Sequence, residues 1–207
     1  MKKAILTYIF AFFGIGIVLV GGVGCPKEVG RANDNKKVYK IGEMGAGGGI
    51  VFYVSEEGFK VYDGEGGEET CHYLEMSEAT LLESKWFPSY DMIGTKTGLG
   101  YGKENTYKIL HAKSESLTEV NCAAYRCNKY STANTKAGEW WLPSKDELDL
   151  IWQNQKDVVV KSCNSPWHWS SSEHNEGNAW EQNFNDGKQG ESSKDRNINS
   201  VRAVRAF

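Results

Sequence analysis

The sequence predicts an α+β domain, and three observations support this fold class. Residues 50–62 combine strand-forming residues with a central Glu-Glu-Gly, which is typical of a hairpin. Residues 144–152 have the capping residues and the periodicity of an amphipathic helix. Residues 167–207 contain three strand-like segments separated by Asn and Gly. With 207 residues, 40% of them apolar and 12% aromatic, the chain can build a packed core.

The first strands are expected between residues 50 and 77. Ile50 to Val54 and Phe59 to Tyr62 form the arms of the predicted hairpin, with residues 56–58 as its turn. The segment "HYLEMS", residues 72–77, predicts a further strand. The segment "DGEGGEE", residues 63–69, lacks the spacing of a calcium-binding loop and indicates a solvated acidic turn.

Two short helices are expected in the middle of the chain. The segment "TGLGYGKENTYKILHA" predicts a glycine-rich loop and then a helix through Ile109. The segment "NCAAYRCNKY" predicts a second helix. Trp140 to Leu142 then indicate a short strand, which Pro143 ends.

The clearest local signal is the start of a third helix. Ser144 stands three residues before Glu147, which is the spacing of a capping box. Leu148, Ile151 and Trp152 share one face of the helix that follows. We therefore expect this face to pack on the core.

The C-terminal part is expected to contain three strands, at Trp167 to Ser171, Ala179 to Phe184 and Ser200 to Phe207. Residues 166–197 place three tryptophans among Asn, Ser, Gly and charged residues. Tryptophan supplies rigid contact area, and Ser, Asn and Gly supply adaptable hydrogen bonding, so this mixture predicts a binding surface. The alternative is that Asn and Gly only serve turns.

The N-terminus has the pattern of an export signal. A short basic start is followed by an uncharged run from Ala4 to Val23 and then by Gly24-Cys25. A small residue directly before Cys resembles the lipobox of bacterial lipoproteins, although Gly22 stands where Leu is usual. The resemblance implies a signal peptide over residues 1–25 that ends at the lipidated Cys25. The alternative is a plain transmembrane anchor.

The composition of the remaining chain indicates its domain organisation and argues against nucleic acid as a partner. Residues 26–38 lack apolar periodicity and are expected to be a tether, with one domain at residues 39–207. The formal charge of −3 does not provide the positive electrostatic potential that attracts nucleic acid, so we expect no nucleic-acid partner. The pairing of Cys71, Cys122, Cys127 and Cys163 stays open in an export compartment that permits disulfides.

The common catalytic and cofactor motifs do not fit. Gly102-Lys103 is followed by Glu104, and Thr97 stands where a phosphate-binding loop needs Gly. No GxSxG motif occurs, and the four His residues lack metal-ligand spacing. We therefore expect neither a cofactor nor a metal.

Seven blocks carry a resemblance to a known family. These blocks are "GGIVFYV", "HYLEMS", "WWLPSKDEL", "WHWSSSE", "AWEQNF", "DGKQ" and "VRAVRAF", in this order. Together they resemble the variable proteins of diversity-generating retroelements, in particular the Treponema variable protein. They also resemble the C-terminal domain of the collagen-like adhesin of Legionella. The resemblance covers nearly all of residues 39–207. It implies a C-type lectin-like fold of the formylglycine-generating-enzyme type, with a small twisted antiparallel sheet, two flanking helices and long loops.

The resemblance also implies a variable ligand-binding region at about residues 166–200. Retroelement mutagenesis replaces adenines in Asn-type codons, which cannot then encode Lys, Glu, Gln, Met or Trp. The expected framework residues are Trp167, Trp169, Glu173, Trp180, Gln182, Gln189 and Lys194. The expected ligand-binding residues are Trp167, His168, His174, Asn175, Gly177, Asn178, Asn185, Asp186, Gly190, Ser192, Asp195, Arg196, Asn197 and Asn199. Trp169 and Trp180 are expected to pack beneath them. Glu176, Glu181, Lys188 and Glu191 do not fit the codon rule, so their status stays open.

The function expected from these inferences is that of a lipid-anchored receptor or adhesin without enzymatic activity. It would be a monomer at the bacterial outer membrane or cell surface and would bind a protein or glycan ligand. Enzymes of this fold oxidise a substrate cysteine with reactive thiols, and no Cys follows Cys163. The alternatives are a periplasmic enzyme on the same fold and a structural lipoprotein.

Overall fold

The computed structural model describes residues 37–112, 116–163 and 165–207. The predicted signal peptide, the lipidated Cys25 and nearly all of the predicted tether lie outside the described residues. From Lys37 onward the chain packs as one unit. Within the described ranges, no helix has the length and apolar character needed to cross a bilayer.

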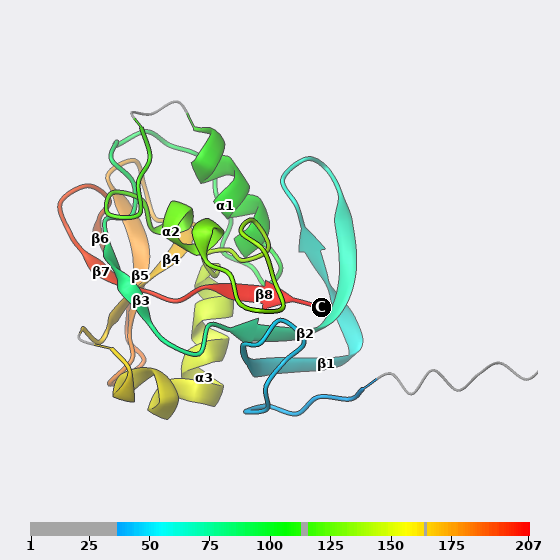
Figure 1. The fold of residues 1–207 in the computed structure, drawn as a ribbon. Helices are drawn as coiled ribbons and strands as arrows, with labels where there is room; N and C mark the ends of the chain where they lie inside the picture. Colours follow the sequence, from blue (N-terminus) through cyan, green and yellow to red (C-terminus); the bar gives the residue numbers. More distant parts are fainter. Residues whose placement is uncertain (1–36, 113–115, 164) are drawn as a thin grey trace, which may run out of the picture. The chain divides into compact units, whose positions relative to one another are not determined.

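The first sheet joins the start of the domain to its C-terminus (Figure 1). β1 (Ile50–Tyr62) pairs antiparallel with β2 (Glu68–Met76), and β2 pairs antiparallel with β8 (Val204–Ala206). The predicted turn at residues 56–58 is wrong, because β1 continues past it with a register shift between Val54 and Phe59.

The turn of this hairpin lies at residues 63–67, within the predicted acidic turn. Asp63 Oδ1 accepts hydrogen bonds from the backbone N–H groups of Glu65 (2.8 Å) and Gly67 (2.9 Å). Gly64 has φ +89°, a conformation that L side chains rarely adopt. The Asp63 carboxylate thus closes the turn itself.

The second sheet has the strand order β3-β7-β4-β5-β6. Its strands are β3 (Leu81–Ser84), β4 (Trp167–Glu173), β5 (Asn178–Asn183), β6 (Gln189–Ser193) and β7 (Asn199–Val201). All pairs are antiparallel except β4 with β7. The sequence predicted neither β3 nor β6. The single strand that it predicted from Ser200 to Phe207 is divided into β7 and β8.

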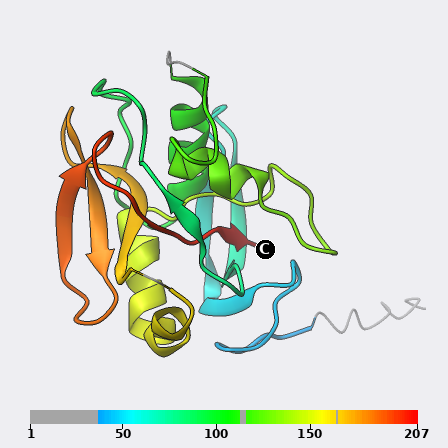
Figure 2. The ribbon, with the colours of Figure 1, turned by 60° about the vertical axis from the view of Figure 1, so that its left-hand side comes forward.

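Three helices accompany the two sheets (Figures 1 and 2). They are α1 (Gly102–His111), α2 (Ala123–Lys129) and α3 (Lys145–Lys161). The predicted capping box is confirmed, since Ser144 Oγ accepts from Glu147 N and the Glu147 carboxylate accepts from Ser144 N. Trp140 to Leu142 do not form the predicted strand and contribute only a bridge between Trp141 and Val204.

The described residues therefore confirm an α+β domain with two sheets and three helices. Two clusters of buried apolar side chains form its core. One cluster includes Trp86, Trp140 and Trp169. The other includes Phe52 and Phe184. Trp169 is fully buried, as the sequence predicted.

Candidate ligand-binding surface

The predicted binding residues lie on and around the antiparallel strands β4, β5 and β6. Glu173 pairs with Ala179, and Asn178 pairs with Ser193, so the connections 174–177 and 194–198 meet at one end of the strands. We call this the loop end. The β5–β6 turn, residues 184–188, lies at the opposite end, which we call the turn end (Figure 2). Six residues of β5 separate the two ends by roughly 20 Å.

A buried ion pair lies beneath the loop end. Lys194 Nζ is 2.6 Å from Glu173 Oε1, and both side chains are almost completely buried. Burial alone raises the pKa of Glu173, but Lys194 and the backbone donors that surround the carboxylate hold this pKa below its usual value. Glu173 is therefore ionised at neutral pH and stays paired with the ammonium.

The same ion pair fixes a third segment, residues 91–95. The Glu173 carboxylate accepts hydrogen bonds from the backbone N–H groups of Ile93 (2.9 Å), Gly94 (2.7 Å) and Thr95 (3.1 Å). Lys194 Nζ donates to the carbonyl of Asp91 at 3.0 Å. Three segments far apart in sequence are thus held together by two side chains.

The backbone of the two connections is also joined directly. Lys194 N donates to the carbonyl of Gly177 at 3.0 Å. In the same region, Lys85 forms an ion pair with Asp195, with Lys85 Nζ 2.9 Å from Asp195 Oδ1. A Cβ added at Gly177 would lie 3.7 Å from the ring of Tyr90, so the segment before residue 91 borders the same surface.

The loop end exposes most of the predicted binding residues. His174, Asn175, Arg196 and Asn197 are exposed. Gly177, Asn178, Ser192 and Asp195 are partly exposed. The structure therefore brings together eight of the predicted residues.

Trp180 belongs to this surface and does not pack beneath it as the sequence predicted. Its partly exposed indole ring lies between the Lys145 ammonium, 4.8 Å from the ring centroid, and the His174 ring, 4.8 Å away in a T-shaped contact. His174 Nδ1 also contacts Glu191. Lys145 was not among the predicted residues, because it comes from the first turn of α3.

Asn175 shapes its own loop. Its Oδ1 accepts hydrogen bonds from the backbone N–H groups of Gly177 and Asn178, both at 2.9 Å. This side chain thus has a structural role besides its exposure. His174 and Arg196 are the better positions for testing ligand contact.

Two predicted contact residues are buried, and this part of the prediction is wrong. His168 is 0% exposed and Asn199 is 6% exposed. Burial and the nearby Arg202 lower the pKa of His168 to about 3, so the imidazole is neutral. Asn199 Nδ2 donates to Glu181. The His168 ring packs against Phe184, with the ring centroids 4.5 Å apart.

The remaining predicted residues lie away from the loop end. Asn185 and Asp186 are exposed on the turn end. Trp167 pairs with Asn183, also towards the turn end, and a Cβ at Gly190 would lie 3.7 Å from its ring. The predicted set therefore does not form one continuous patch.

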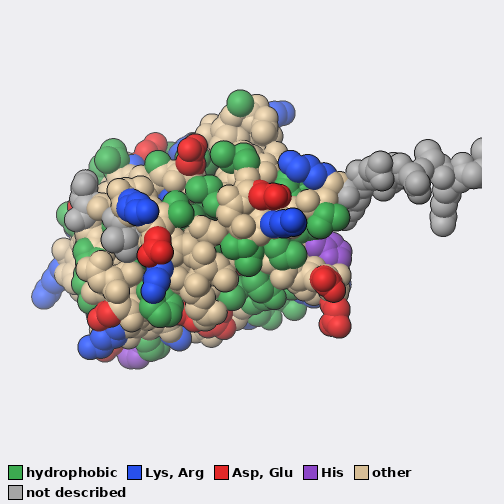
Figure 3. All heavy atoms as spheres, turned by 90° about the horizontal axis from the view of Figure 1, so that it is seen from below, with side chains coloured by type: hydrophobic (Ala, Val, Ile, Leu, Met, Phe, Trp, Pro, Cys, Tyr) green, Lys and Arg blue, Asp and Glu red, His purple; other side chains and the backbone are tan. Residues whose placement is uncertain are grey.

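The described residues show mixed surface charge, no cluster of metal-ligating side chains, and buried thiols at Cys122 and Cys127. Figure 3 shows basic and acidic side chains interspersed on the face that it presents. No three His, Cys, Asp or Glu side chains of the described residues gather as metal ligands would. Burial raises the pKa of Cys122 to about 11 and that of Cys127 well above its usual value. Both thiols are protonated at neutral pH.

Comparison with known proteins gives a likeness of fold. No protein-family model and no curated protein matches the sequence. A solved structure with a similar fold is that of a fimbrial protein from Bacteroides ovatus ATCC 8483, with a TM-score of 0.50 and 16% sequence identity. The alignment covers 77% of this chain and 44% of that chain, so this chain spans less than half of the fimbrial protein.

Proposed function

We propose that this chain is a lipid-anchored bacterial surface protein whose loop end binds a protein or glycan ligand. The observation that carries the proposal is the buried Glu173–Lys194 pair, which fixes three separate segments under a set of exposed polar side chains. A binding site needs its contact residues on a rigid support. The Glu173–Lys194 pair offers such a support without using the exposed side chains of His174 and Arg196.

The split between framework and variable residues supports a role in retroelement-driven variation. Trp169, Glu173, Gln182 and Lys194, all assigned to the framework by the codon rule, are buried. The positions assigned to variation at the loop end are exposed or partly exposed. Substitution at these positions therefore leaves the core intact.

The surface location is supported by the fold likeness to a fimbrial protein and by the lipobox-like Gly24-Cys25. In this proposal Cys25 carries the lipid, and the chain acts as a monomer on the outer membrane or cell surface. In this proposal the domain is a C-type lectin-like one, and its five-stranded sheet carries the loop end. Ligand binding requires no catalytic residue, metal or cofactor.

An adhesion assay tests the site. Cells that display the full chain are applied to arrays of glycans and of extracellular proteins. His174→Ala combined with Arg196→Ala should reduce capture by about tenfold or more, because both side chains are exposed at the loop end. Asp186→Ala is the matched control, since it changes an exposed residue at the turn end. Equal capture by all three proteins would refute the loop-end site and favour a structural lipoprotein.

Sequences of sibling isolates test the diversification separately. We expect substitutions to concentrate at His174, Asn178, Arg196 and Asn197, with Glu173 unchanged. Substitutions spread evenly over buried and exposed positions would contradict retroelement variation, while leaving ligand binding at the loop end open to the adhesion assay.

A further inference from the structure

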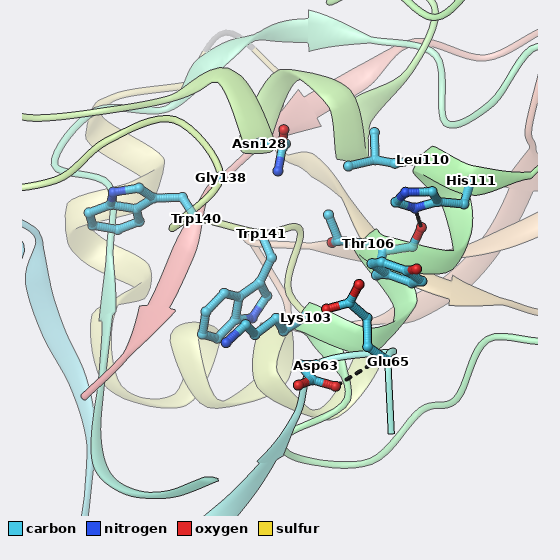
Figure 4. A pocket seen from close by; sticks show the side chains of 11 residues that line it. Asp63, Glu65, Lys103, Thr106, Leu110, His111, Asn128, Gly138, Trp140 and Trp141 are labelled. Carbon is cyan, nitrogen blue, oxygen red and sulfur yellow. Dashed lines mark hydrogen bonds between the residues drawn. The ribbon is translucent and has the colours of Figure 1, made fainter. Parts of the chain in front are cut away.

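A cavity lies away from the loop end, between the β1–β2 turn and helices α1 and α2. Its volume is about 430 Å³, within the size range of small-ligand sites. Figure 4 shows the Asn128 side chain entering from α2 and the Glu65 carboxylate entering from the opposite side. None of the residues that line it belongs to β4, β5 or β6.

The cavity has a fixed aromatic wall. The Trp140 and Trp141 indole N–H groups donate to Thr135 at 2.7 Å and to Glu147 at 3.3 Å, and the two residues are only 1% and 3% exposed, so the open aromatic surface of the cavity comes from Tyr107 and His111. Tyr107 stacks on His111 with a centroid distance of 4.0 Å. A Cβ at Gly64 would lie 2.7 Å from the Tyr107 ring, so the glycine lets the β1–β2 turn close against this wall.

Polar groups converge on the aromatic wall. Asp63, Glu65 and Lys103 contribute two negative charges and one positive charge, which leaves −1. Lys103 Nζ is also 3.1 Å from Glu69, so its charge is shared with an acid outside the cavity lining. Asp63 is oriented by its hydrogen bonds within the turn. The cavity is therefore unfavourable for an anion.

We propose that this cavity binds a neutral saccharide unit. Carboxylate and amide groups at Glu65 and Asn128 match the hydroxyl groups of a sugar, and the aromatic wall matches its C–H surface. The net negative lining selects against uronic and sialic acids. This site is independent of the loop end, so the chain would hold two ligand sites on one domain.

Saturation-transfer NMR on the full chain tests the proposal. The probes are free glucose, galactose, mannose and N-acetylglucosamine, with glucuronate and choline as charged comparisons. The full chain includes the apolar run from Ala4 to Val23 and is therefore kept in a detergent, which must contain neither sugar nor choline groups. We expect saturation transfer to at least one neutral sugar and weaker transfer to glucuronate. Glu65→Gln and Asn128→Ala should each raise the Kd of the bound neutral sugar by about tenfold.

Matched controls separate this site from the loop end. Glu57→Gln, an exposed acid of β1 outside the cavity, should leave the Kd unchanged. The loop-end double variant His174→Ala with Arg196→Ala should also leave it unchanged. Near-ultraviolet circular dichroism checks that the cavity variants are folded. Three results would overturn the proposal: no transfer to any neutral sugar, a Kd unaffected by both cavity variants, or binding of choline in place of sugars. None of these results bears on adhesion through the loop end.

Discussion

The two ends of the β4-β5-β6 strands are built differently although both expose polar side chains. At the loop end, exposed residues lie above the buried Glu173–Lys194 pair, which holds residues 91–95 as well as both connections. At the turn end, the exposed Asn185 and Asp186 lie in a local turn, in which side chains of Asn183 and Asp186 accept from nearby backbone N–H groups.

The difference shows what makes one exposed loop a better binding site than another. The turn end is shaped by contacts two residues apart in sequence and by Gly187, which packs against Trp152. The loop end is shaped by contacts about 80 to 100 residues apart, from side chains that a ligand does not touch. Exposed residues such as His174 and Arg196 can therefore change while the Glu173–Lys194 support stays constant.

The largest expected effect comes from removing the cation under the loop end. Lys194→Met leaves the buried Glu173 carboxylate without its charge partner, so the free energy of unfolding should fall by about 3 kcal/mol. Urea unfolding measures this change. Amide hydrogen exchange should also accelerate at Ile93 to Thr95, while the amides of residues 184–188 keep their rates.

A second variant tests the cause. Adding Glu173→Gln to Lys194→Met removes the buried charge but keeps an acceptor for the backbone donors, so part of the lost stability should return. If Lys194→Met costs less than about 1 kcal/mol, the ion pair does not support the loop end and the comparison between the ends fails.

Residues that act locally could be predicted from the sequence. The Ser144–Glu147 capping box and the acidic turn at Asp63 depend on neighbours within four residues. The turn predicted at residues 56–58 was wrong, because β1 continues through it by pairing with β2, and this pairing is not a local property. β6, with the sequence QGESS, is a strand only because β5 pairs with it.

The candidate site shows the same limit. The prediction placed Trp167 and His168 together as contact residues, with Trp169 packed beneath them. The structure instead packs the His168 ring against Phe184, with the ring centroids 4.5 Å apart, and places it near Arg202, so His168 is buried. The role of Glu173 in fixing residues 91–95 could not be predicted, because nothing in either segment marks the other.

The next largest effect is a pH dependence of the free energy of unfolding, caused by His168, which pairs with Gln182 near the turn end. The pKa of His168 is lowered to about 3 from its usual 6.5, so folding favours the neutral imidazole. The stability that this gives is fully present above pH 6.5 and is lost as the pH falls from 6.5 towards 3. Between pH 6.5 and 5 the wild type should lose up to about 2 kcal/mol relative to His168→Gln, at about 1.4 kcal/mol per pH unit.

Urea unfolding at several pH values checks this loss. Glu173 provides the internal contrast, because its lowered pKa gives stability that persists above its usual value of 4.5 and is lost only at lower pH. As the pH falls, stability should therefore be lost first through His168, near the turn end, and then through Glu173, under the loop end. Equal slopes for wild type and His168→Gln between pH 6.5 and 5 would contradict the burial of a neutral imidazole.

A smaller effect is expected from the cap of α3, which supports the loop end from the helix side. Lys145 N donates to Ser172 Oγ at 3.0 Å, and the Lys145 ammonium lies over Trp180. Ser144→Ala should cost about 1 kcal/mol, because the backbone N–H of Glu147 loses its acceptor. Thermal unfolding measures the loss, and Ser144→Asp, which keeps a capping oxygen, is the control. If amide hydrogen exchange in Ser144→Ala accelerates more at the turn end than at the loop end, the cap does not support the loop end.

The smallest effect is expected from Asp186→Ala at the turn end. The change removes a single local hydrogen bond, from Lys188 N to Asp186 Oδ1, on an exposed turn. The free energy of unfolding should stay within about 0.5 kcal/mol of the wild type, and ligand capture should not change. Arg196→Ala, an exposed change of similar stability cost at the loop end, should lower capture instead. If both variants lower capture equally, the ligand spans the roughly 20 Å between the ends, and rigid support from the buried ion pair is not what selects the binding surface.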